Sequence, residues 1–240
     1  MEDVNKTKKE EKISSKRKVA VSTVITTIIV LIILIFIIML CKQVLIIKGL
    51  QNKISEYIDS SNYSIISTAY DGNSISYDEC FVNGNKYISS TNLLDREHNN
   101  KTSTFSDGKT INTYIESGET KIAMLNTDEG APSKKEVIDS LETDSFGEFI
   151  YMLFSAKISS AKCNGKDCYK IENLKTSNFL YTENGYNTIY LDKETGLLVR
   201  VIIGDSNKDS KDSIIDYSYE FNTITDEDIK EPDISEYEVK

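Results

Sequence analysis

The longest apolar stretch of the chain lies close to its N-terminus. Residues 19–41 read VAVSTVITTIIVLIILIFIIMLC and contain no charged side chain. A helix of this length spans about 34 Å, which is enough to cross a hydrocarbon core about 30 Å thick. We therefore expect a transmembrane signal-anchor helix over 19–41, preceded by a basic tail over 1–18.

The charges around this helix predict its orientation. Seven Lys or Arg residues precede it, whereas only Lys42 and Lys48 follow it closely. By the positive-inside rule, the tail is cytoplasmic and the chain beyond Lys48 is extracellular, which makes a single-pass protein of the cell membrane. A cleaved signal peptide is the alternative, but its apolar region would be shorter and would end in small residues. A lipoprotein cysteine at Cys41 would need a small residue before it, and Leu40 stands there. Acylation of Cys41 in place is left open.

Beyond Lys48 the continuous apolar run gives way to short periodic segments. Residues 49–60 place Leu50, Ile54 and Tyr57 on one face of a helix. Period-two alternation with turn residues at short intervals then predicts two meanders of antiparallel strands. The expected strands are 63–70, 75–82, 86–90, 102–106, 110–116, 121–125, 159–163, 168–172, 187–191, 197–203 and 213–222.

A helical segment separates the two meanders. Ser133 and Glu136 have the spacing of a capping box at its start, and an apolar stripe continues from there to Ile158. The stripe consists of Val137, Ile138, Leu141, Phe146, Phe149, Ile150, Leu153 and Phe154. Many hairpins with helices in two blocks predict an α+β fold, a curved antiparallel sheet of about ten strands with helices on one face. Residues 48–240 are enough for one such domain.

The charge distribution narrows the functions that this domain can have. The chain has 28 Lys and Arg against 38 Asp and Glu, with a pI near 4.8. Residues 1–47 carry a net +4, so residues 48–240 carry −14. An acidic surface of this kind argues against nucleic-acid binding and against attraction to an anionic lipid surface.

The segment 169–237 resembles a known family. It contains YKIENL, then TIYLDKETGLLVRVI with its Asp-x-x-Thr-Gly hairpin, then YSYEFNTITDEDIKEPDISEY with Pro232 near the end. These features are similar to the lipoprotein-carrier superfamily (LolA/LolB-like), especially membrane-anchored versions in low-GC bacteria, and the order of elements extends the resemblance to 50–240. The resemblance implies a half-open barrel with helices on its concave, apolar face, which binds acyl chains. The resemblance identifies no ligand-binding residue in this chain. This chain also differs from the carriers in keeping a transmembrane anchor, which a protein that shuttles between membranes would not have.

Two cysteines form the sharpest local feature of the domain. Cys163 and Cys168 flank a predicted turn, so in a hairpin they would face each other across the strands, and an extracellular disulfide is permitted. A redox pair would use C-x-x-C at a helix start, and a zinc site would need two further ligands. We expect a structural disulfide between Cys163 and Cys168, and we expect Cys80 to be a buried apolar residue.

Other candidate sites have weaker patterns. The run from Asp205 to Asp216 begins like a calcium loop, but Ser210 stands where such a loop needs glycine. His98 is the one histidine, and it lies in a polar stretch without a nucleophile motif nearby. No nucleotide-binding, zinc-protease or serine-hydrolase motif is found. We therefore expect no enzyme activity, no cofactor and no metal.

These observations lead to two functional hypotheses. The first is a membrane-anchored extracellular protein that binds a lipid or an acylated protein in a cavity like that of the carriers. The candidate lining, which depends on the resemblance, is Phe146, Phe149, Ile150, Met152, Leu153 and Phe154. The second is an extracellular sensor or protein-interaction domain on the same scaffold with no internal ligand. An open apolar cavity favours the first, and a filled concave face favours the second.

Overall fold

The computed structural model describes residues 2–72, 74–95, 99–127, 141, 146–172, 185–205 and 213–240. His98, the capping box at Ser133 and Glu136, and residues 206–212 of the candidate calcium loop lie outside these ranges, as do Val137 and Ile138. The chain divides into two compact units, Met1–Ile46 and Ile47–Lys240.

The first unit consists of most of a long helix, α1, which runs from Glu2 to Ile58. The large apolar side chains from Val24 to Met39 are exposed along it. Within the described ranges, α1 is the one helix that is long and apolar enough to cross a membrane, a property that signal sequences share. The predicted apolar helix is thus confirmed, and its role as a permanent anchor stays a prediction.

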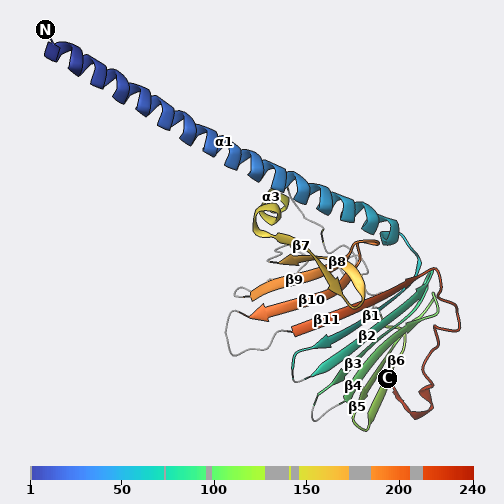
Figure 1. Ribbon diagram of the computed structural model, residues 1–240. Helices are drawn as coiled ribbons and strands as arrows, with labels where there is room; N and C mark the ends of the chain where they lie inside the picture. Colours follow the sequence, from blue (N-terminus) through green and yellow to red (C-terminus); the bar gives the residue numbers. More distant parts are fainter. Residues whose placement is uncertain are drawn as a thin grey trace. The chain divides into compact units, whose positions relative to one another are not determined.

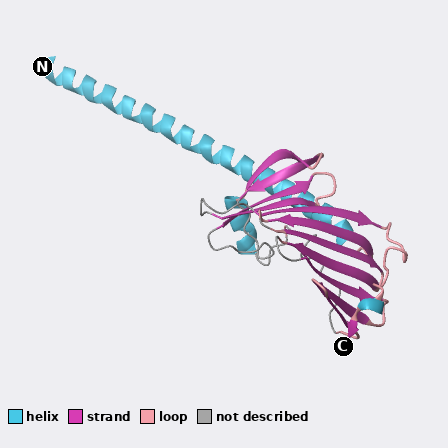
Figure 2. Cartoon of the chain, turned by 90° about the horizontal axis from the view of Figure 1, so that it is seen from below, coloured by secondary structure: helices cyan, strands magenta, loops and turns pink. Residues whose placement is uncertain are grey.

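The second unit is built on one sheet of twelve strands, which Figures 1 and 2 show as a strongly twisted ribbon. The order across the sheet is β12-β6-β5-β4-β3-β2-β1-β11-β10-β9-β8-β7. Neighbouring strands are antiparallel, except that β12 runs parallel to β6. The strands are β1 (Asn62–Tyr70), β2 (Ile75–Asn83), β3 (Lys86–Leu94), β4 (Asn99–Ser106), β5 (Ile111–Ser117), β6 (Thr120–Met124), β7 (Lys157–Cys163), β8 (Lys166–Glu172), β9 (Gly185–Asp192), β10 (Leu198–Asp205), β11 (Ser213–Phe221) and β12 (Glu238–Val239). In the part of this unit that the structure describes, the helices are the end of α1, α3 (Phe146–Ser155) and the short η1 (Ile234–Glu236).

The hairpins follow from the turn chemistry of the sequence. In the β7–β8 turn, Asn164 and Gly165 have φ values of 48° and 80°. Positive φ at both central residues is the geometry whose twist matches the flanking strands, and Asn-Gly is the pair that adopts it at least cost. The predicted meanders on either side of the helical segment are confirmed, with one further strand, β12, that the alternation does not predict.

The sheet has two differently covered faces. We call the side that carries Tyr63, Val82 and Phe221 the helix face, because the ring of Tyr57 near the end of α1 lies 4.6 Å from that of Phe221. The strand register continues this face to the second meander, where its buried members are Val201, Ile189 and Ile171. Three residues of α1 complete this core and are 2% exposed or less: Ile47, Leu50 and Ile54.

The opposite side, which carries Asn112, Tyr114 and Glu116, is covered by the C-terminal tail, residues 222–240. We call it the tail face. The hydroxyl of Tyr114 donates a hydrogen bond to Glu231, and that of Tyr237 donates to Glu116 at 2.7 Å. Tyr114 is 1% exposed beneath these contacts. The tail then ends as β12 on the edge strand β6, so that the same segment covers a face and an edge.

Candidate functional site

Aromatic rings follow one another along β11 on the helix face. Tyr217, Tyr219 and Phe221 are two residues apart, so they project to the same side of the strand. Their rings are stacked, with centroids 6.3 Å apart between Tyr217 and Tyr219 and 6.4 Å between Tyr219 and Phe221. All three residues are half-buried. We call this set the aromatic row.

Small hydroxyl side chains continue from the aromatic row across the first meander. Tyr217 pairs with Ser67, which pairs with Asp78, and the line continues to Thr91 and Thr102. The neighbouring line from Tyr219 passes through Ile65 and Cys80 to Ser89 and Thr104. We call the polar members the hydroxyl patch: Ser67, Asp78, Ser89, Thr91, Thr102 and Thr104.

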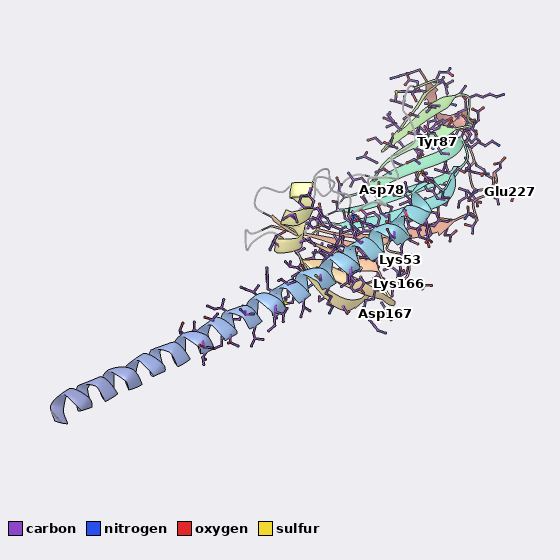
Figure 3. The ribbon with its side chains drawn as sticks, turned by 90° about the horizontal axis from the view of Figure 1, so that it is seen from above. Lys53, Asp78, Tyr87, Lys166, Asp167 and Glu227 are labelled. Carbon is purple, nitrogen blue, oxygen red and sulfur yellow. The ribbon has the colours of Figure 1, made fainter. Side chains whose placement is uncertain are left out.

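Exposure increases across this patch, away from β11. Ser67 is 9% exposed, and its hydroxyl donates to Oδ2 of Asp78 at 3.2 Å. Thr91 and Thr102, farther along, are exposed. In Figure 3, Asp78 and Tyr87 are labelled on the strands of this meander, and Lys53 on α1. The helix face is therefore apolar where α1 covers it, and it is polar and accessible over β3 and β4.

The phenol of Tyr219 is the one buried hydroxyl in the described part of the sheet without a hydrogen-bond partner. Burial, with a smaller effect from Tyr217, raises its pKa well above the usual value. Burial and the Asp78 carboxylate raise the pKa of Tyr217 as well. Both phenols therefore stay protonated at neutral pH. A buried donor that is left unsatisfied costs about 1–3 kcal/mol.

The six residues predicted to line a cavity lie on α3, and they do not share one environment. Met152 and Leu153 are buried at 0% and 6% exposure. Phe146 and Phe154 are exposed at 79% and 59%, and Phe149 and Ile150 are half-buried. The stripe therefore divides into an inner part that is buried in the domain and an outer part whose side chains are exposed.

The predicted disulfide partners are near neighbours but not directly opposite each other. Across the two strands, Cys163 lies opposite Lys166 and Cys168 lies opposite Ala161. The reason is that the turn consists of two residues, Asn164 and Gly165, instead of the four expected. The two cysteines are therefore diagonal neighbours, with Cα atoms about 7–8 Å apart, whereas a disulfide needs less than about 7 Å. Both are buried free thiols that pack with Val199, and burial raises the pKa of each. The disulfide stays a prediction, and closing it requires a small shift of the strands.

Two other expectations concern Cys80 and Asp216. Cys80 is buried as a free thiol, as expected, and burial raises its pKa to about 11. Asp216, which ends the candidate calcium run, instead accepts two hydrogen bonds from Arg200, at 2.6 and 2.7 Å, and one from Asn164 at 3.0 Å. Among the described residues, no group of three His, Cys, Asp or Glu side chains is placed to hold a metal ion.

The sequence contained a signal for the aromatic row that the periodicity alone did not single out. Three aromatic residues at alternate positions of YSYEF must lie on one face of any strand, and only the pairing with β1 shows that this face adjoins a hydroxyl patch. By contrast, the α3 stripe was visible in the sequence, but its division into an inner and an outer part was not.

Comparison with known proteins finds likeness in structure alone. No protein-family model matches the sequence, and no curated protein matches it. An uncharacterized conserved protein from Thermus thermophilus is similar with a TM-score of 0.45 at 9% identity, over 80% of this chain and 97% of that one. MucB is similar with a TM-score of 0.42 at 9% identity, over 77% of this chain and 62% of MucB.

Two further solved structures contain MucB together with MucA, one of them from Pseudomonas aeruginosa. The similar structures also include a LolA superfamily protein from Nitrosomonas europaea, with a TM-score of 0.27 at 10% identity, over 77% of this chain and 97% of that one. The superfamily that the sequence resembles is thus among the similar structures. TM-scores this low do not show a shared fold, so nothing about function follows from them.

Proposed function

We propose that the chain is a single-pass membrane protein whose extracellular domain binds an extended segment of another protein on its helix face. The observation that supports this most is the junction of the aromatic row with the hydroxyl patch. Apolar rings and hydrogen-bonding groups lie side by side there on one sheet surface, and its outer members are exposed.

The chemistry of this surface suits a polypeptide. Tyr side chains offer a large apolar area with a polar tip and lose little rotamer freedom on binding, which is why they are enriched in interfaces. Ser and Thr hydroxyls both donate and accept, so they can satisfy the backbone groups of an extended segment. Binding of this kind needs no cofactor and no reacting group, in keeping with the expectation that the protein is not an enzyme.

A lipid or an acylated protein is the second candidate ligand, and the aromatic row favours it. The stacked rings of Tyr217 and Tyr219 next to Ile65 would remove an acyl chain from water, at about 0.8 kcal/mol for each CH₂ buried. Asp78 argues against this candidate, because its carboxylate lies on the same face, and covering an ionised group with hydrocarbon is costly. We therefore place the protein segment first.

The anchor and the orientation belong to the same proposal. The basic tail over 1–18 stays in the cytoplasm, α1 crosses the membrane over 19–41, and the acidic domain over 48–240 lies outside. A net charge of −14 over 48–240 keeps that domain solvated and repels it from anionic surfaces.

Site-specific photocrosslinking in cells tests the proposed surface. A photoreactive amino acid replaces Thr91 on the helix face, and the matched control carries it at Asn99, which is also exposed but lies on the tail face of the adjoining strand. We expect a protein adduct from Thr91 that is absent from Asn99. A lipid adduct from Thr91 would establish the second candidate. Equal labelling from both positions, or none from either, would overturn the proposal.

A further inference from the structure

The outer side of α3 carries an apolar stripe with two exposed phenylalanines. Phe146, Ile150 and Phe154 are four residues apart, so they lie one above the other on the helix. Phe146 is 79% exposed and Phe154 is 59% exposed, while Met152, on the side of the helix opposite Ile150, is 0% exposed. Phenylalanines this exposed at regular spacing mark a surface for an apolar partner.

The chain itself limits what that partner is, because a residue that contacts α3 follows the apolar run by only a few positions. Nζ of Lys48 lies 5.2 Å from the ring centroid of Phe149 on α3. Lys48 is seven residues beyond Cys41, and seven residues of helix rise about 10 Å. The polar layer of a bilayer extends about 5–8 Å beyond the hydrocarbon on each side. Even when fully extended, seven residues span at most about 25 Å, so the chain keeps Lys48, and α3 with it, within reach of that layer.

The composition of α3 fits this depth. Its sequence FGEFIYMLFS combines aromatic and aliphatic side chains with a single charged residue. Amphipathic helices that lie in the interface bury a face of Trp, Phe and Leu side chains in the boundary between headgroups and acyl chains.

We propose that the outer stripe of α3, Phe146, Ile150 and Phe154, inserts into the outer leaflet of the membrane that α1 crosses. The inference rests on the proposed membrane anchoring, and it adds a second, interfacial contact to the transmembrane one. The stripe contains no basic residue, so burial of apolar side chains alone makes the contact. Membrane insertion of α3 therefore requires no anionic lipid and does not weaken at high salt concentration.

The absence of tryptophan from the chain provides a direct test. Single variants Phe146→Trp and Phe154→Trp of the full chain are reconstituted in phosphatidylcholine vesicles with a nitroxide-labelled lipid, the label lying high on the acyl chain. Tyr77→Trp, on an exposed position of β2, is the matched control, and Phe36→Trp reports on α1 itself. We expect quenching of the two α3 variants to exceed that of Tyr77→Trp by about threefold or more, unchanged at high salt.

The possible results distinguish a failure of the α3 contact from a failure of the membrane anchoring by α1. If Phe36→Trp is quenched while Phe146→Trp and Phe154→Trp are quenched no more than Tyr77→Trp, the interfacial contact is overturned and the anchor stands. If Phe36→Trp is not quenched either, α1 does not enter the bilayer, and both the anchoring and the inference fail. Quenching of the α3 variants that disappears in high salt would contradict an apolar contact.

Discussion

The close approach of α1 to the β9–β10 turn depends on one glycine, and replacing it gives a quantitative test of that contact. Gly196 lies in the β9–β10 turn with φ +79°. A Cβ atom there would be 2.9 Å from the carbonyl oxygen of Leu50 and 3.0 Å from Cγ1 of Ile54. Both of these atoms belong to the buried side of α1, so Gly196→Ala would force the helix away from the hairpin.

A matched variant separates the strain in the turn from the clash with the helix. Gly165 has nearly the same backbone conformation, φ +80°, but a Cβ atom there meets nothing within 4 Å. Gly165→Ala should therefore cost only the left-handed backbone penalty, about 1–2 kcal/mol. Gly196→Ala should cost that amount and a further 1–3 kcal/mol, roughly, for overpacking against α1.

The two variants are compared by thermal unfolding of the full chain in detergent, followed by circular dichroism. For a domain of this size, 1 kcal/mol corresponds to about 2–4 °C in the melting temperature. We expect a clearly larger decrease for Gly196→Ala, together with faster hydrogen exchange in the α1 residues that contact the hairpin. Equal decreases in the two variants, with unchanged exchange, would show that α1 does not pack on this turn.

Three further predictions concern single side chains. Tyr219→Phe should leave the melting temperature unchanged or raise it by an amount equivalent to about 1 kcal/mol, because it removes a buried hydroxyl without a hydrogen-bond partner. A marked decrease in melting temperature would show that the hydroxyl does have a partner. Protein purified from the cell membrane without reducing agent should have a mass two hydrogens lower than the reduced protein, because a disulfide joins Cys163 and Cys168. Alkylation of both cysteines in the native protein would contradict the disulfide. Hydrogen bonds from Arg200 and Asn164 lower the pKa of Asp216, so its contribution is present above about pH 4 and is lost as the pH falls through the lowered pKa. Asp216→Asn should therefore destabilise the domain at pH 7, by less than about 1 kcal/mol for this half-exposed pair, and should cease to differ from the unmodified protein in strong acid.

The backbone of the domain could be predicted largely because its signals are local. Turn pairs such as Asn164-Gly165 and the alternation between them are properties of adjacent residues, and the hairpins on both sides of the helical segment form where they indicate. β12 was not predicted because two residues carry no alternation. Its pairing with β6 depends instead on distant tail contacts, such as that of Tyr237 with Glu116.

The candidate site was less predictable, because it depends on register and on orientation. Cys163 and Cys168 were expected to face each other, but shortening the turn by two residues moves each opposite a different residue. The spacing of the α3 stripe predicts a helix with an apolar side. That side is so broad that one of its residues, Met152, is buried while another, Phe146, is exposed. Only the packing of the domain decides which part of the stripe faces outward.

The pairing of β1 with β11 has a consequence for how the domain is made. The strands are neighbours at the middle of the sheet, yet they come from opposite ends of the domain: the backbone N–H of Ile224 bonds to the side chain of Asn62, 162 positions earlier. Local hairpins form early during synthesis, but β1 has one unpaired edge until almost the whole domain has been made. Contacts so distant in sequence form slowly, and an open strand edge in the meantime invites pairing with other chains. Chains that end before β11 should therefore aggregate, whatever the stability of their hairpins.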